Sequence, residues 1–213
     1  MQALQRGAMP TCLGNYRHGL HNWGHVTGDD KAAIWVELEA MQGQRCAYCE
    51  ADISVAPKHI EHFRQKGRDP SVTFLWSNLF GSCNRRDSCG KHKDHGCLPY
   101  DAANLIKPDE ENPEDFFLFV TDGTIAVRSG LTQIDKNRAE ETLRIFNLHA
   151  KHGPLRNMRR KAIAGYVSTG EDARAMVLAG EISFDECVDL LQSELAATVH
   201  LPFSTAIKHA LLP

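Results

Sequence analysis

The sequence predicts an α+β protein with a small, cysteine-rich core between helical flanks. Three observations favour this class: a Cys46-x-x-Cys49 pair before a short extended run, a hairpin signal at Asp122-Gly123, and amphipathic helical patterns on both sides. Hydrophobic residues make up 42% of the 213, so the chain can bury a core. We expect three parts: an N-terminal arm and helix (1–43), a metal-rich core (44–97), and a hairpin followed by a helical region (98–213).

The N-terminal part begins as an irregular arm rich in Gly, His and Asn. Residues 29–42 follow it with two acidic residues at their start and with Ile34, Leu38 and Met41 at positions i, i+4 and i+7. This spacing predicts an amphipathic helix that leads into the first cysteine pair.

No apolar run approaches the roughly 18–20 residues that a membrane-spanning helix requires. The first twelve residues, MQALQRGAMPTC, lack the basic flank and apolar stretch of a secretory signal. We therefore expect a cytoplasmic protein without membrane contact. In that reducing compartment, grouped cysteines favour a metal site over disulfides.

Five of the seven cysteines lie within residues 46–97 and predict a structural zinc site. Cys46-x-x-Cys49 has the spacing of a zinc knuckle, in which a tight turn brings two thiolates onto one ion. The second pair is Cys83 and Cys89, and it is irregular because five residues lie between them. Cys97 or a nearby histidine could replace Cys89 as the fourth ligand. The distant Cys12 and Cys187 are expected to be ordinary thiols. The expected zinc ligands are Cys46, Cys49, Cys83 and Cys89.

The net charge of −3 hides an uneven distribution. Residues 44–97 contain nine Lys/Arg and six Asp/Glu, so this core carries +3 and the remainder −6. A modestly basic centre in an acidic frame suits a site that meets phosphate locally and needs help to hold a long polyanion.

The histidines of the core belong to an ordered pattern. His59-Ile60-Glu61-His62 ends a short extended run, and Trp-Ser-Asn78 and a Cys/His/Lys-rich segment follow. This order resembles the HNH nuclease motif, whose ββα-metal fold has a hairpin followed by a helix, often with zinc knuckles at its base. The resemblance implies that His62 is the general base, that Glu61 binds a catalytic metal ion, and that Asn78 braces the active-site loop.

One position departs from the common pattern. There, a His or Asn directly follows the last zinc cysteine, whereas Gly90 follows Cys89 here. We favour His92 as the missing ligand, and Lys93 matches the Lys that often closes the motif. The resemblance thus implies a catalytic magnesium or manganese ion held by Glu61 and His92, beside the structural zinc. Three other residues could take the place of His92: Asn84, Asp87 and Asp94.

The resemblance extends over roughly residues 17–165. The segments CAYCE, HIEHFRQK, WSNLFGSC, CGKHKD, DAANLIKPDEENPEDFF and RAEETLRIFNL together resemble the HNH nuclease subunit of the Septu and retron-associated anti-phage systems, the PtuB-like proteins. That family implies an endonuclease that hydrolyses phosphodiester bonds and assembles with an ABC-type ATPase (PtuA-like), with residues 98–213 as the expected partner-binding part. A retron context adds the reverse transcriptase and ncDNA of the retron as further partners.

The substrate stays open at this point. DNA is favoured for an HNH site, and RNA, including tRNA, is the second possibility. The rival function is a non-catalytic zinc-binding adaptor that docks the ATPase, and the empty position after Cys89 keeps it in contention. His59 and Glu61 also form half of the zinc-deaminase signature, but its Pro-Cys-x-x-Cys is missing, which argues against a deaminase.

The region after Pro99 predicts a hairpin and then helices. Apolar runs flank Asp122-Gly123, a dipeptide suited to a tight type I′ turn. Ser183 and Glu186 have the spacing of a capping box at the start of a late helix. Trp76 is expected in the core. Four cations form a basic helix surface that is either a nucleic-acid contact or an ordinary exposed face: Arg156, Arg159, Arg160 and Lys161.

Overall fold

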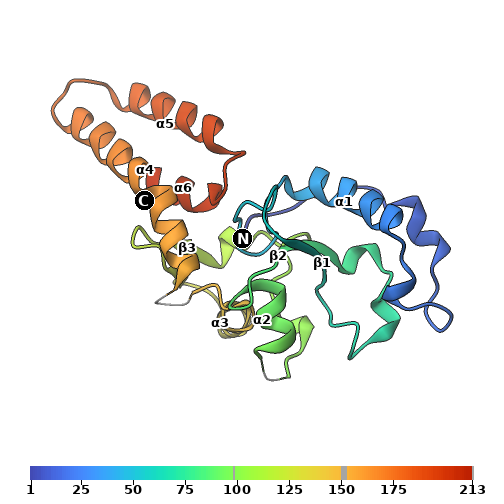
Figure 1. The fold of residues 1–213 in the computed structure, drawn as a ribbon. Helices are drawn as coiled ribbons and strands as arrows, with labels where there is room; N and C mark the ends of the chain where they lie inside the picture. The colour runs from blue at the N-terminus through green and yellow to red at the C-terminus, as the bar shows by residue number, and fades with distance from the viewer. Residues whose placement is uncertain (98, 150–152, 213) are drawn as a thin grey trace.

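A computed structural model of the protein describes residues 1–97, 99–149 and 153–212, and the fold is α+β as predicted (Figure 1). The helices are α1 (Gly28–Gln42), α2 (Cys89–His95), α3 (Gln133–Phe146), α4 (Pro154–Leu178), α5 (Phe184–Thr198) and α6 (Ser204–Leu211). The strands are β1 (Lys58–His62), β2 (Leu79–Cys83), β3 (Phe117–Phe119) and β4 (Ile125–Val127). Single 3₁₀ turns lie at Thr11–Asn15, Trp23–His25, Pro70–Val72, Trp76–Asn78, Ala102–Asn104 and Pro113–Asp115.

Helix α1 confirms the predicted helix over 29–42. The Thr27 hydroxyl caps it by accepting from the Asp30 amide at 3.1 Å, and Ile34 and Leu38 are fully buried. The helix packs against β2 at Gly81, where a Cβ atom would lie 2.7 Å from the Gln42 side chain. Glycine is therefore what lets the helix approach the strand so closely.

The unit that positions the site consists of β1, β2 and α2. The two strands pair antiparallel, with His59 opposite Ser82 and Glu61 opposite Phe80. Because side chains alternate along a strand, Gly81 faces α1 while Ser82 faces α2, where its hydroxyl accepts from the Gly90 amide at 3.3 Å. The hairpin therefore lies between α1 and α2, as Figure 1 shows.

The second hairpin, β3–β4, is present as predicted, but the type I′ turn is wrong. Val120 and Thr124 pair across the turn, the Gly123 amide donates to Val120 O at 2.9 Å, and only Gly123 of the loop has a positive φ, +87°. The loop therefore has three residues and ends in a left-handed glycine. The Asp122 carboxylate explains this choice, because it accepts from the Thr124 amide at 2.9 Å and favours the longer loop.

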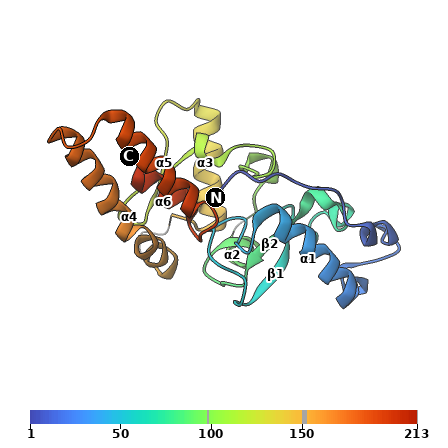
Figure 2. The ribbon, with the colours of Figure 1, turned by 90° about the horizontal axis from the view of Figure 1, so that it is seen from above.

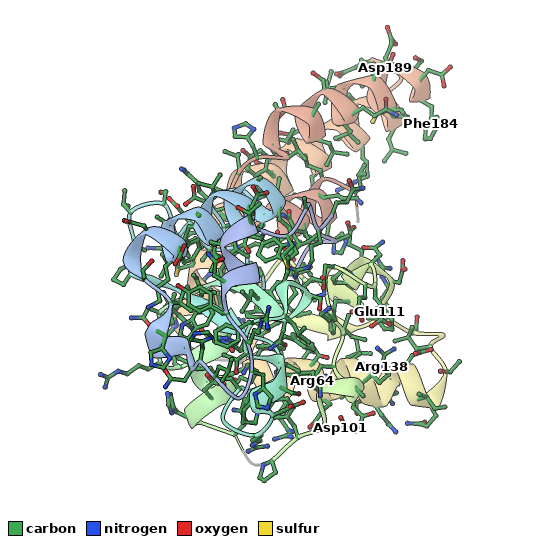
Figure 3. The ribbon with its side chains drawn as sticks, turned by 90° about the vertical axis from the view of Figure 1, so that its right-hand side faces the viewer. Arg64, Asp101, Glu111, Arg138, Phe184 and Asp189 are labelled. Carbon is green, nitrogen blue, oxygen red and sulfur yellow. The ribbon has the colours of Figure 1, made fainter. Side chains whose placement is uncertain are left out.

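The C-terminal helices form an arm. Helix α3 packs against α2, whereas α4 and α5 run side by side away from the core (Figures 1 and 2). Phe184 and Asp189 lie at the far end of this arm (Figure 3). The predicted capping box of Ser183 and Glu186 is confirmed at the start of α5. Helix α6 returns to the core, where it contacts α4 and β3.

The basic surface predicted on α4 is wrong for Arg159. Its side chain is 1% exposed, donates to Gly123 O and to Leu148 O, and lies over the Phe119 ring at 5.4 Å. Position 159 lies on the buried face of α4 with Leu155 and Ile163, four residues away on either side. Arg160 and Lys161 are exposed as expected.

Two other features bear on the sequence predictions. Trp76 belongs to the core, with its indole N–H donating to Gly7 O at 3.0 Å. No helix in the described ranges combines the length and the apolar character needed to cross a bilayer.

Candidate active site and zinc centre

The structure brings the four predicted zinc ligands together. The Sγ atoms of Cys46, Cys49, Cys83 and Cys89 all lie within 4.8 Å of one another, and all four side chains are buried. The Cys49 and Cys83 sulfurs are 3.9 Å apart. Tetrahedral zinc with bonds of about 2.3 Å would separate its sulfurs by roughly 3.8 Å. A set of four thiols at this spacing therefore fits a structural zinc ion.

The local fold explains how three separate segments meet at this cluster. The first pair lies in a tight turn in which the Glu50 amide donates to Cys46 O at 2.9 Å, with Glu50 in a left-handed conformation. Cys83 ends β2, and Cys89 starts α2 with a positive φ of 58°. The cluster thus fastens the turn, the hairpin and the helix to one point. Cys12, Cys97 and Cys187 lie outside it.

Glu61 is the buried acid of the site. Its carboxylate is 2% exposed, with Oε1 2.7 Å from Lys93 Nζ and Oε2 2.8 Å from His59 Nε2. Burial opposes ionisation, but His59 and Lys93 outweigh it and hold the pKa of Glu61 below its ordinary value. The carboxylates of Glu61 and Asp94 likewise outweigh burial and raise the pKa of Lys93. Glu61 is therefore an ionised carboxylate in a buried site.

His62, the next residue, is oriented by a backbone carbonyl. Its Nε2 lies 3.0 Å from Thr73 O. A carbonyl oxygen can only accept, so Nε2 carries the proton and Nδ1 keeps a free lone pair. Trp23 of the N-terminal arm lies edge-on to the imidazole at 4.5 Å. Burial and the nearby Lys66 lower the pKa of His62 to about 4, so the ring is neutral at physiological pH.

Asn78 holds the loop that carries Thr73. Its Oδ1 accepts from the Arg64 amide at 2.7 Å, and its Nδ2 donates to Arg64 O at 3.0 Å and Val72 O at 3.2 Å. The side chain is buried, so these three bonds join the two ends of the 63–78 loop. Asn78 therefore fixes the loop whose Thr73 carbonyl contacts His62, as the predicted bracing role would require.

His92 does not meet Glu61 in the structure. Its Nδ1 lies 2.9 Å from Ile145 O on α3 and 3.2 Å from Cys97 Sγ. Asp94 contacts Lys93 at 2.5 Å, and Asp87 lies 3.7 Å from Arg85. None of the hydrogen bonds or ion pairs in the described part of the chain joins these residues to Glu61. The assignment of His92 as a ligand stays a prediction.

A cleft of about 400 Å³ opens beside this unit, lined by Asn84, Arg86, Lys91 and His95. Asn84 and Arg86 lie in the segment after β2, and Lys91 and His95 lie on α2. The side chains of Arg86 and Lys91 suit an anionic ligand such as a phosphate.

Comparison with known proteins supports the resemblance seen in the sequence. Over 140 residues, 62% of this chain, it is 32% identical to the "Retron Vc95 putative HNH endonuclease" of Vibrio cholerae serotype O1 biovar El Tor. Over 68 residues, 31% of this chain, it is 35% identical to the "Septu protein PtuB" of Bacillus thuringiensis. The chain is homologous to both proteins. The matches span 64% and 26% of these curated relatives, less than two thirds of either. No family model matches the chain.

The sequence analysis missed two contacts of Glu61, with His59 and with Lys93. A pattern in the sequence could have indicated each of them. His59 shares a strand face with Glu61 because alternate residues of a strand, here positions i and i+2, point to the same side. In an α-helix that starts at Cys89, Lys93 lies three residues from Gly90 and shares its face, whereas His92 points almost the opposite way. The helical phase therefore favours Lys93 over His92 as the neighbour of Glu61.

Proposed function

We propose that this protein is a metal-dependent HNH endonuclease that hydrolyses phosphodiester bonds of nucleic acid as part of an anti-phage system. The observation that carries the proposal is the orientation of His62. Thr73 O holds the proton on Nε2, burial keeps the ring neutral, and Nδ1 is left to accept a proton. A neutral, oriented imidazole is what the general-base activation of water requires.

Glu61 supplies the second requirement, a hard ligand for a divalent ion. A buried, ionised carboxylate suits magnesium or manganese, which prefer oxygen donors and keep several water ligands. When bound, such an ion stabilises the charge that develops on the phosphate and on the leaving oxygen. Glu61 and His62 are consecutive at the end of β1 and face opposite sides of the strand.

Charge supports a nucleic-acid substrate. The cleft next to α2 is lined by Arg86 and Lys91, whereas the whole chain carries −3. Such a surface contacts a few phosphates and leaves the grip on a long strand to a partner. We propose DNA as the substrate, with tRNA or other RNA as the second candidate. An ABC-type ATPase subunit, PtuA-like, is the proposed partner, because one relative is named as a Septu protein.

A second function has one observation in its favour. Glu61 and His62 are only 2% and 3% exposed, and the Lys93 ammonium already neutralises Glu61. A closed, neutralised site of this kind fits a zinc-stabilised adaptor that docks the ATPase without cutting nucleic acid.

A cleavage assay with His62→Ala separates the two functions. Purified protein, alone and in complex with its ATPase, is offered plasmid DNA and total tRNA in parallel, with magnesium or manganese. We expect His62→Ala to lower the cleavage rate by about 100-fold or more, because general-base catalysis typically contributes that much. His200→Ala, at an exposed histidine on the C-terminal arm, is the matched control and should cut normally.

Zinc content and complex formation are measured on the same samples, and both should be unchanged in His62→Ala. Cleavage at the wild-type rate by His62→Ala would contradict the proposed mechanism. An intact, zinc-loaded complex that cuts neither substrate would favour the adaptor.

A further inference from the structure

We propose that His59 is the nitrogen ligand of the catalytic divalent ion and that it replaces the helix ligand absent from position 90. This inference rests on the proposed function, because it assigns a ligand to the ion that Glu61 would bind. The sequence predicted ligands on two elements, Glu61 on β1 and His92 on α2, whereas this proposal places both protein ligands on β1. His59 and Glu61 would hold the ion together from β1.

The first argument is the contact itself. His59 Nε2 lies 2.8 Å from Glu61 Oε2, and the two residues share one face of β1. An imidazole nitrogen and a carboxylate oxygen at this distance can bind one ion without a change of backbone. The carboxylate oxygen suits magnesium or manganese, and the imidazole nitrogen beside it favours manganese over magnesium.

The second argument is the unsatisfied capacity of Glu61. Its Oε1 is buried, and the contact of Oε1 with Lys93 at 2.7 Å is an ion pair rather than an aligned hydrogen bond. Buried polar atoms are rarely left in this state, and a bound ion is one of the recognised causes.

The third argument is that α2 leaves no room for a ligand. A Cβ atom at Gly90 would lie 2.2 Å from Glu61 Oε2, so the space that a side chain at position 90 would need is filled by the carboxylate. The other residue that α2 directs at Glu61 is Lys93, a cation that cannot bind a metal while charged. His92 is turned toward Ile145 O.

The number of ligands is consistent with the chemistry. Within the described residues, the four cysteines form the only group of three or more His, Cys, Asp or Glu ligand atoms gathered at metal-binding distance. The catalytic ion would therefore have two protein ligands. Water and phosphate oxygens would fill the other positions, as is usual for magnesium and manganese at phosphate sites.

Manganese bound to the zinc-loaded protein tests the proposal without an activity assay. Electron spin-echo spectroscopy detects a nitrogen nucleus bound directly to Mn²⁺, and calorimetric titration gives the affinity. We expect nitrogen coupling in the wild type and its loss in His59→Gln, with a manganese affinity lower by about tenfold or more. His92→Gln, the matched histidine on α2, should keep both the coupling and the affinity.

The variants also separate the failure of this inference from the failure of the proposed function. Coupling that survives His59→Gln, or disappears in His92→Gln, would overturn the role of His59. Glu61→Gln should abolish manganese binding. If it does, and the wild type shows no nitrogen coupling, His59 is not a ligand but the Glu61 metal site stands. If Glu61→Gln binds manganese like the wild type, the metal site of the proposed function is also wrong. Unchanged zinc content shows that each variant is folded.

Discussion

At the scale of single residues, Gly90 decides what Glu61 can reach. Because Gly90 has no side chain, the Glu61 carboxylate lies directly against the first turn of α2. Lys93, on the same face of α2, forms an ion pair with it. The size of the residue at position 90 therefore limits where the Glu61 carboxylate can lie. This is the same position at which the HNH motif usually has a His or Asn.

The substitution Gly90→Ala tests this constraint. Alanine suits a helix better than glycine by about 1 kcal/mol, and the φ of Gly90 is not positive, so the backbone tolerates the change. Its methyl group, however, would lie 2.2 Å from Glu61 Oε2 and must displace the carboxylate. We expect cleavage to fall by about tenfold or more with normal zinc content.

Gly165→Ala is the matched control, because this glycine lies in α4 with open space where a Cβ would be. Both variants are compared by kcat/KM and by zinc analysis. Full activity in Gly90→Ala would show that the position of the Glu61 carboxylate does not limit the reaction.

At the scale of elements, the four-cysteine cluster joins the segments that carry the candidate site. The β1–β2 hairpin has only two strands, and a two-stranded sheet is marginal by itself in water. Four buried thiols join the turn before β1, the end of β2 and the start of α2 at one point. A zinc ion bound by these thiols would help to hold Glu61 and His62 in position.

Loss of a zinc ligand should weaken this unit as a whole. We expect about one zinc per wild-type chain and clearly less in Cys83→Ser. Structural zinc contributes of the order of 10 kcal/mol to folding, and losing even about 4 kcal/mol would lower Tm by roughly 8–16 °C. Cys187→Ser, a buried cysteine on α5 outside the cluster, should keep its zinc and most of its Tm. Metal analysis and thermal unfolding with and without a chelator provide the check, and equal zinc in Cys83→Ser and wild type would contradict the assignment.

Local spacing accounts for what could be predicted of this site. The Cys-x-x-Cys turn, the extended run with Glu61 and the helix over 29–42 are patterns of neighbouring residues, and the structure contains each of them. Contacts set by tertiary packing could not be predicted in this way. Trp23 reaches His62 from the distant N-terminal arm, and Arg159 is buried because its helix face packs on the core.

At the scale of the whole molecule, α6 ties the C-terminal arm to the rest of the chain. The Phe203 and Thr205 amides donate to the Glu50 carbonyl and carboxylate, and Glu50 also pairs with the Met1 amine at 2.6 Å. Glu50 follows the first zinc knuckle directly. The arm is therefore anchored beside the four-cysteine cluster.

The other anchor of α6 is Glu114, and it predicts a pH dependence. Glu114 Oε2 lies 3.2 Å from His209 Nε2 and 2.8 Å from Lys208 Nζ. Because His209 Nδ1 accepts from the Phe119 amide, Nε2 carries a proton and donates to Glu114 even when the ring is neutral. The hydrogen bond from His209, with help from Lys208, lowers the pKa of Glu114 to about 2.

A carboxylate with a lowered folded-state pKa stabilises the protein above its unfolded pKa, about 4.5, and loses this contribution as the pH falls toward 2. After allowance for solvent screening, we expect Glu114→Gln to lower the free energy of unfolding by about 1–2 kcal/mol at pH 7. This difference from wild type should shrink below pH 4.5, whereas Glu140→Gln, at an exposed 3.9 Å pair with Lys136, should show little difference at any pH. Denaturant unfolding between pH 7 and pH 3 measures the free-energy difference of each variant from the wild type. Zinc release at low pH does not affect these differences, because it occurs in the wild type and in both variants. A difference between Glu114→Gln and wild type that stays constant across this range would show that the ionised Glu114 does not anchor α6.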